Sequence, residues 1–173
     1  MAAHNGEISW FSPDPRAIIP VDERFHVPHG LKRTLKKGAF ETRINTAFEQ
    51  VMRACSNRKE TWINEEIISS YVNLHHLGYA HSVETWFEGK LAGGLYGVAL
   101  QGVFFGESMF HEVTDASKVA LHALVTRMRE RGMQLLDTQW TTPHLLNFGT
   151  YEIPRAKYLK LLRAALELEC EFA

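Results

Sequence analysis

The sequence predicts an α+β domain in which a mixed sheet is flanked by helices, and three observations carry this prediction. The 173-residue chain has 45% hydrophobic and 23% charged residues, which is ordinary for one globular domain. Three strand-like stretches follow one another between residues 82 and 110, separated by turn sequences at 88–90 and 101–102. A helical pattern precedes them, and further helical and strand patterns follow. This order fits one sheet packed against helices.

The N-terminal part of the chain is expected to be irregular. Its four prolines, Pro13, Pro15, Pro20 and Pro28, remove backbone donors and restrain the residues before them. We therefore expect residues 1–38 to form a Pro-rich, basic extension packed on a single domain that spans residues 1–173.

A strand and a short helix are predicted within residues 40–56, and a clearer helix follows. Thr61 or Asn64 can cap this helix, since both are good N-cap residues. Ile67, Tyr71 and Leu74 recur at the spacing of one helical face, and Gly78 is expected just past its end.

The second half of the chain completes the predicted order. Strands are expected at 82–87, 91–100 and 103–110, and a helix starts within 114–117 and ends at Gly132. Residues 133–140 predict another strand, and Pro154 is expected at the first position of a last helix. Helix, three strands, helix, strand and helix is an order used by the acyltransferase fold of the N-acetyltransferase superfamily.

Two carboxylates stand in strand-like runs where an unpaired charge is costly. Glu107 lies in the aromatic run 104–110, and Asp137 precedes Gln139 by two residues, so that these two side chains are expected on one face. Burying a carboxylate costs several kcal/mol unless it is paired or used. The pattern predicts a pocket that holds a cationic or amine-bearing group. The alternatives are a structural ion pair for Glu107 and a strand-end polar pair satisfied by turn amides for Asp137 and Gln139.

Ordered motifs along the chain resemble those of the leucyl/phenylalanyl-tRNA–protein transferases. The resemblance spans about residues 10–162. Its motifs are WFSPDPR at 10–16, GGLYGV at 93–98, FFGESMF at 104–110, ASK at 116–118 and DTQ at 137–139.

The resemblance implies a cytoplasmic enzyme without a cofactor. It would move leucine or phenylalanine, with methionine as a further candidate, from aminoacyl-tRNA to the α-amino group of proteins that begin with arginine or lysine. The product would be an N-degron that marks the acceptor for protein degradation.

The resemblance also implies roles for individual residues. Asp137 and Gln139 would be catalytic: Gln139 would accept a hydrogen bond from the attacking amine, and Asp137 would orient Gln139 and receive the proton directly or through water. Glu107 would bind substrate at the pocket floor. The pocket for the aminoacyl side chain would be lined by Trp62, Leu95, Phe104 and Met128. Core packing is the alternative interpretation for the last three.

A basic run is the expected contact with tRNA. Because the net charge is −1, only a local basic patch can attract nucleic acid. The resemblance assigns this patch to Lys32, Arg33, Lys36 and Lys37. A solvated helix face is the alternative. Residues 26–30 depart from the family pattern, and the chain is expected to lack the family's usual N-terminal segment and C-terminal tail.

Other sequence features limit the possible locations and ligands of the protein. No apolar run reaches the ~18 residues of a membrane span, and the N-terminus does not read as a signal peptide. Cys55 and Cys170 do not make a disulfide framework, and His75, His76 and His81 lack metal-ligand spacing. We expect a monomer without membrane contact or bound metal.

Two rival functions fit the sequence less well. An acyl-CoA-dependent N-acetyltransferase would need a pyrophosphate-binding loop at a helix N-terminus, but the nearest match, residues 129–134, ends a helix and lacks the final small residue. A non-catalytic binding module is the second rival.

Overall fold

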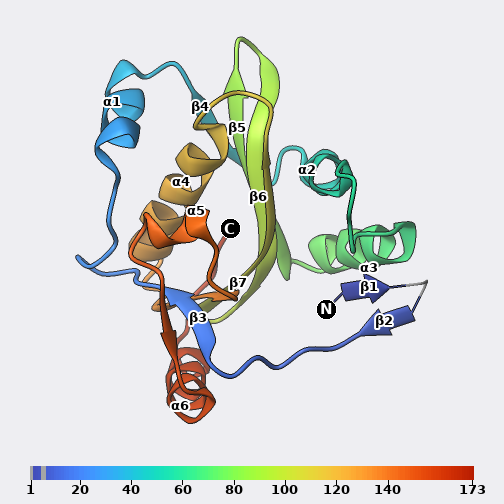
Figure 1. The fold of residues 1–173 in the computed structure, drawn as a ribbon, viewed down its shortest axis with the longest axis vertical. Helices are drawn as coiled ribbons and strands as arrows, with labels where there is room; N and C mark the ends of the chain where they lie inside the picture. The colour runs from blue at the N-terminus through green and yellow to red at the C-terminus, as the bar shows by residue number, and fades with distance from the viewer. Residues whose placement is uncertain (1, 5–6) are drawn as a thin grey trace.

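A seven-stranded mixed sheet is the centre of the computed structural model, which describes residues 2–4 and 7–173 (Figure 1). The strand order is β4-β5-β6-β7-β8-β3-β9. Neighbouring strands are antiparallel except β7 and β8, which run parallel. The strands are β3 (Arg16–Ile19), β4 (Glu41–Ile44), β5 (Ala80–Phe87), β6 (Lys90–Leu100), β7 (Val103–His111), β8 (Leu135–Gln139) and β9 (Tyr151–Ile153).

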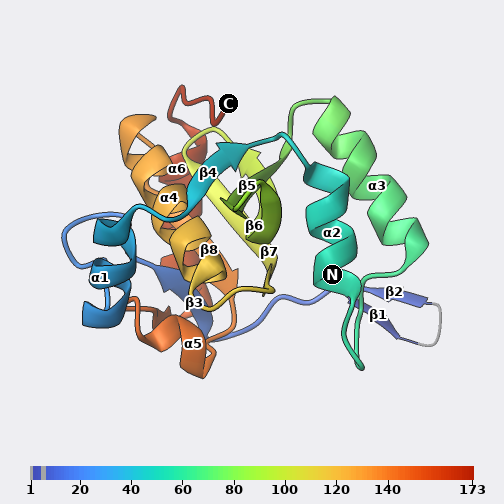
Figure 2. The same ribbon diagram turned by 90° about the horizontal axis from the view of Figure 1, so that it is seen from above.

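Helices cover both faces of this sheet. Seen from above, α4 lies on one face and α2 with α3 on the other, and α1 lies on the α4 side (Figure 2). A parallel strand pair needs a crossover connection, and α4 supplies it between β7 and β8. The helices are α1 (His29–Lys37), α2 (Phe48–Ser56), α3 (Glu65–His76), α4 (Ala116–Glu130), α5 (Pro143–Leu146) and α6 (Arg155–Leu166). A hairpin of β1 (Ala2–His4) and β2 (Glu7–Ser9) precedes the sheet.

Alternating strand residues fill cores on the two faces. On the α4 face, Leu95, Phe104 and Leu136 pack against that helix. On the opposite face, Tyr96 packs with α2 and α3, and Val103 packs under α6. The expected α+β sheet flanked by helices is therefore confirmed.

The predicted elements after residue 40 are confirmed within a few residues. Asn64 caps α3 by accepting a hydrogen bond from the backbone N–H of Ile67 at 2.9 Å. Gly78 follows the helix with φ 83°, a left-handed conformation that glycine adopts without steric cost. Pro154 lies one residue before α6 and not at its first position. None of the described helices is long and apolar enough to cross a membrane.

The expectation of an irregular extension over residues 1–38 is wrong, since this range contains the β1–β2 hairpin and two further elements. Residues 16–19 form β3, which lies inside the sheet between β8 and β9, and residues 29–37 form α1. β3 is a buried four-residue run between Pro15 and Pro20, too short to show a period. Proline at a strand end does not stop pairing, so the proline-rich composition was misleading. The sequence also did not predict α5 and β9, because these elements are too short to show a period.

Candidate functional site

A cavity of about 670 Å³ opens where β7 and β8 separate. The two strands pair only from Val103 to Phe105 on β7 and from Leu135 to Asp137 on β8. Beyond this point β7 continues to His111, while β8 ends at Gln139. The free edge of β7 and the end of β8 therefore form two walls of the cavity, and its volume falls in the range of ligand sites.

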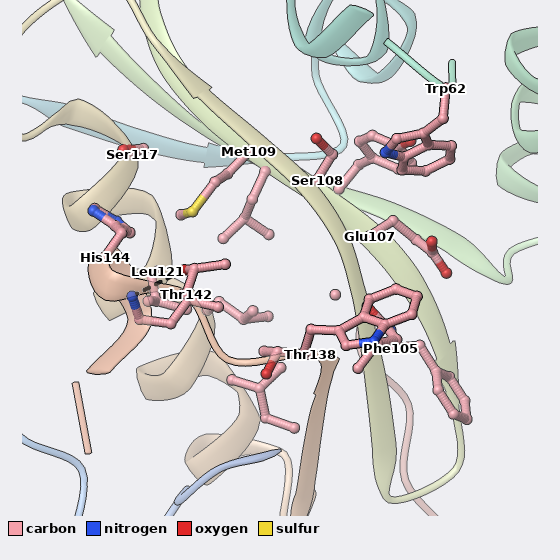
Figure 3. A pocket seen from close by; sticks show the side chains of 18 of the residues that line it. Trp62, Phe105, Glu107, Ser108, Met109, Ser117, Leu121, Thr138, Thr142 and His144 are labelled. Atoms are coloured by element: carbon pink, nitrogen blue, oxygen red, sulfur yellow. Dashed lines mark hydrogen bonds between the residues drawn. The ribbon is translucent and has the colours of Figure 1, made fainter. Parts of the chain in front are cut away.

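A β-bulge in β7 places Glu107 on this free edge. Tyr96 of β6 pairs with Ser108, and Gly97 pairs with Gly106, so Glu107 is the extra residue. Figure 3 shows Glu107 and Trp62 on one side of β7, with Met109 and Leu121 on the other. The cavity thus reaches past the edge of the strand to both faces of the sheet, with a polar half and an apolar half.

The apolar half of the cavity is built by four different elements. Leu95, predicted as a pocket residue, comes from β6 and lines this half. Trp62, also predicted, lines the other half of the cavity. The side chains that join Leu95 are Met109, Leu121, Leu124 and Leu136, from β7, α4 and β8. Such a surface selects a ligand by shape and apolar contact.

Phe104 and Met128, predicted as pocket residues, are not on the cavity wall. Both are completely buried. Phe104 lies where β7 is still paired with β8, and its ring packs 5.0 Å from that of Phe172. Met128 follows Leu124 by one helical turn and belongs to the same core. Both residues therefore belong to the core, and neither contributes to the cavity wall.

Asp137 is completely buried in a network of charges and hydrogen bonds. Arg16 donates to both carboxylate oxygens, from Nη2 at 2.6 Å and from Nε at 3.0 Å. Tyr158 donates its hydroxyl to Oδ2 at 2.7 Å. Burial, followed by the effect of Asp137, raises the pKa of Tyr158. Two-point contact with a guanidinium is a strong form of ion pair, so this carboxylate is already satisfied within the protein.

Gln139 lines the cavity, whereas Asp137 does not. The backbone of Gln139 has a φ of 60°, which is unusual for a residue other than glycine. This conformation breaks the alternation of side-chain directions expected for a strand. The backbone N–H of Gln139 donates to Oδ1 of Asp137 at 2.9 Å. Strained backbone persists where the surroundings hold it. Asp137 is thus placed to fix the conformation from which the side chain of Gln139 reaches the cavity.

Glu107 differs from Asp137 in having no salt bridge among the described residues. Its side chain lies in the polar half of the cavity, and burial raises its pKa. Burial, followed by the charge of Glu107, also raises the pKa of the neighbouring Tyr71. The hydroxyl of Tyr96 is buried at the same cavity with no hydrogen-bond partner in the described structure. The Tyr96 hydroxyl therefore has hydrogen-bonding capacity that the described residues leave unused.

Arg58 supplies a positive charge to the cavity wall. Its Nε donates to the carbonyl oxygen of Cys55 at 2.8 Å, and its Nη2 donates to Ser108 Oγ and to the carbonyl oxygen of Met109 at 2.9 and 2.8 Å. All these acceptors are neutral. Within the described residues its charge is not paired with a carboxylate, so it is available to an anionic ligand.

The four basic residues predicted to contact tRNA lie together on α1. Lys32, Arg33, Lys36 and Lys37 are all at least partly exposed, and none lines the cavity. Leu31 on the other face of α1 is buried against the α4 side of the sheet. The run is therefore a helix with a free basic face. The described residues contain no group of three or more His, Cys, Asp and Glu that could hold a metal ion.

Sequence reasoning missed several residues that the structure brings to the site. Arg16 belongs to the WFSPDPR motif, which indicates the family resemblance but does not indicate which residue Arg16 contacts. Tyr158 lies in the predicted last helix, where the sequence pattern does not distinguish it from other helix residues. Leu121 and Leu124 lie in the helix predicted to end at Gly132, and helical periodicity does not separate a core residue from a residue of a cavity wall.

Comparison with solved structures supports the fold. The structure of L-PGS from Bacillus licheniformis aligns with a TM-score of 0.50 at 14% identity, over 79% of this chain and 50% of that chain. The C-terminal domain of a putative lysylphosphatidylglycerol synthetase from Agrobacterium fabrum also aligns with a TM-score of 0.50. The identity is 11%, over 91% of this chain and 58% of that chain. These likenesses concern the fold alone, and they agree with the expected α+β arrangement of a mixed sheet flanked by helices.

Sequence comparisons are more specific. The family described as leucyl/phenylalanyl-tRNA protein transferase matches residues 18–163. Proteins of that name are 58% identical in Herpetosiphon aurantiacus, over 97% of this chain and 88% of the relative, and 60% identical in Akkermansia muciniphila, over 94% and 86%. A third protein of that name, from Rubrobacter xylanophilus, is 53% identical over 100% of this chain and 91% of the relative. The chain therefore belongs to the leucyl/phenylalanyl-tRNA–protein transferase family.

Proposed function

We propose that this protein transfers an aminoacyl group from aminoacyl-tRNA to the α-amino group of an acceptor protein. The cavity at the separation of β7 and β8 carries the proposal. Its lining combines apolar side chains with the Glu107 carboxylate, the unpartnered Tyr96 hydroxyl and the Arg58 guanidinium. Leucine, phenylalanine or methionine would occupy the apolar half. Family membership supports the same reaction class.

The reaction needs little chemical assistance from the protein. The neutral α-amine attacks the ester carbonyl, a C–N bond forms, the ester C–O bond breaks, and the amine's proton ends on the departing ribose hydroxyl. An α-amino group has a pKa near ~8, so part of it is neutral at pH 7. Because the ester is already activated, positioning of the two reactants is the main requirement, and no cofactor is required.

Gln139 would accept a hydrogen bond from the attacking amine and hold its lone pair toward the carbonyl carbon. We assign Asp137 a positioning role in place of the direct proton acceptor expected from the sequence. Its close contacts with Arg16, Tyr158 and the Gln139 backbone already occupy both carboxylate oxygens, and it does not line the cavity.

Glu107 would receive a cationic group of a substrate, since a half-buried carboxylate without a salt bridge gains most from an ammonium or guanidinium. Acceptors that begin with arginine or lysine fit this charge. The exposed basic face of α1 would hold tRNA phosphates. The product would be an N-degron made by a cytoplasmic, monomeric enzyme.

The surroundings of α4 give no support to an acyl-CoA-dependent function. Pyrophosphate binds where a helix N-terminus offers free N–H groups. Asp115 occupies that position, and its carboxylate accepts from Lys118 at 2.7 Å and from Thr34 at 2.9 Å. A carboxylate there would repel pyrophosphate.

A transfer assay tests the proposal. Leucyl-, phenylalanyl- and methionyl-tRNA are offered with a peptide that begins with arginine, and valyl-tRNA and an Ala-initiated peptide are controls. We expect transfer from the first three charged tRNAs, weak use of valyl-tRNA because of its width near Cβ, and little modification of the control peptide. Failure with every charged tRNA, or transfer of acetyl from acetyl-CoA instead, would refute the proposal.

A further inference from the structure

We propose that Trp10, Phe11 and Trp140, which we call the aromatic platform, stack on unpaired bases of the tRNA 3′ strand. The bases concerned are those before the nucleotide that carries the amino acid. This inference rests on the proposed aminoacyl-tRNA substrate and names the surface that receives the rest of its single-stranded end.

The platform consists of large aromatic side chains in solvent beside the cavity. Trp10 is 81% exposed, Phe11 53% and Trp140 50%, and all three line the cavity. The rings of Phe11 and Trp140 meet edge to face with centroids 6.0 Å apart. Clustered exposed aromatics of this kind mark binding surfaces, and a flat ring is suited to base stacking because every base has a π-face.

The backbone that carries the platform is fixed to the rest of the domain. The backbone N–H of Arg155, at the start of α6, donates to Asp14 at 3.0 Å. The guanidinium of the same residue donates to the carbonyl oxygen of Ser12 at 2.7 Å. Trp140 directly follows Gln139, whose N–H is held by Asp137. The aromatic rings are therefore presented from a defined surface, which limits the entropy lost when a ligand orders them.

The position of the reacting atoms determines what arrives at this surface. The amino acid is esterified to the last ribose, so the ester carbonyl has to lie beside Gln139 for the reaction to occur. The chain of preceding nucleotides must then leave through the mouth of the cavity, and Trp140 is the residue next to Gln139 in the sequence. Unpaired bases that leave the cavity beside Trp140 pass the platform.

Charge favours nucleic acid over a polypeptide as the occupant. Arg58, which lines the same cavity, hydrogen-bonds only to neutral oxygens in the described structure. A guanidinium without a carboxylate partner, lining the same cavity as the exposed aromatic rings, suits a ligand that alternates phosphates and bases. An acceptor protein with a basic first residue gains nothing from that charge.

The test compares two aminoacyl donors that differ only in the RNA beyond the last nucleotide. Leucyl-tRNA and leucyl-adenosine are used with an Arg-initiated peptide, and kcat/KM is measured for each donor. We expect wild type to prefer leucyl-tRNA. In Trp10→Ala and Trp140→Ala this preference should fall about tenfold, since stacking contributes a factor of about 5 to 150 per base. Tyr79→Ala, which removes a similarly exposed aromatic ring that does not line the cavity, is the matched control and should keep the wild-type preference.

A binding measurement makes the inference independent of catalysis. The unacylated trinucleotide CCA is titrated while tryptophan fluorescence is recorded, and stacking should quench the wild type, with an affinity about tenfold weaker after either tryptophan is removed. If both variants keep the wild-type preference for leucyl-tRNA, the proposed role of the aromatic platform is refuted, and the proposed transfer reaction is unaffected. A rise in KM for the acceptor peptide alone would assign the surface to the acceptor protein. Absence of transfer by wild type with CCA binding intact would refute the proposed function and leave the platform standing.

Discussion

Two carboxylates beside one cavity, Asp137 and Glu107, show how burial and pairing separate a structural charge from one that is free for a ligand. Asp137 is completely buried, and both its oxygens accept hydrogen bonds from Arg16, Tyr158 and Gln139. Glu107 is half-buried on a β-bulge and has no salt bridge in the described structure. Removing the first should therefore damage the fold, and removing the second should damage mainly the affinity for a cationic group.

The largest effect is expected from Asp137→Ala. This change leaves the largely buried guanidinium of Arg16 without its partner, and breaking a buried pair costs about 3–5 kcal/mol. Urea unfolding measures the loss, with Glu107→Ala as the comparison. A loss below about 1 kcal/mol for Asp137→Ala, or an equal loss for both variants, would erase the distinction between the two carboxylates.

The next effect concerns catalysis through Gln139. Asp137→Asn keeps the size and one acceptor oxygen but weakens control of the Gln139 backbone. A displaced catalytic group can cost about 10²-fold, so we expect kcat to fall by about that factor while KM for leucyl-tRNA stays near the wild-type value.

A double variant decides whether Asp137 acts through Gln139. If the two residues form one unit, Asp137→Asn with Gln139→Ala should be no slower than Gln139→Ala alone, because effects within a unit do not multiply. Multiplicative losses would show that Asp137 has an independent role in the chemistry.

The third effect is a pH dependence carried by Glu107. Burial raises its pKa above the ordinary value of 4.5, so its contribution to stability is present below that pH and lost as pH rises through the higher folded pKa. Glu107→Gln has no such loss and should be more stable than wild type at pH 7–8, with each 1 kcal/mol raising Tm by about 2–4 °C. Melting curves from pH 4 to 8 test this, and a difference in Tm that does not grow with pH would contradict it. A higher KM for the Arg-initiated peptide is expected in the same variant.

The smallest effect lies outside both carboxylates, on the basic face of α1. Replacing Lys32 and Lys36 with glutamine should reduce the slope of log K against log salt by about 0.7–0.9 for each phosphate that is no longer neutralised. Titration of tRNA between 50 and 200 mM salt measures the slope, and Lys90→Gln, an exposed lysine on β6, is the control. An unchanged slope would make the face a solvated surface with no part in tRNA binding.

The sequence by itself determined the local elements and the chemical class of the main site residues. Asn64 and Gly78 set the ends of α3 because capping and left-handed backbone are properties of single residues. The turns at 88–90 and 101–102 predicted the three central strands for the same reason. Glu107 and Gln139 could be selected as cavity residues because a polar group in a strand-like run is unusual wherever the strand lies.

Only the tertiary structure decided which residues meet. Arg16 and Asp137 are 121 positions apart, and they pair because residues 16–19 enter the sheet beside β8, which no local pattern indicated. Likewise, Phe104 and Phe105 are neighbours of similar character, yet Phe104 is core and Phe105 lines the cavity. Neighbouring strand residues point to opposite faces of the sheet, and only the assembled domain decides which of the two lies on the cavity wall. Strand pairing joins distant segments, and its limits are set by the packing of the whole domain, so neither can be read from composition or period alone.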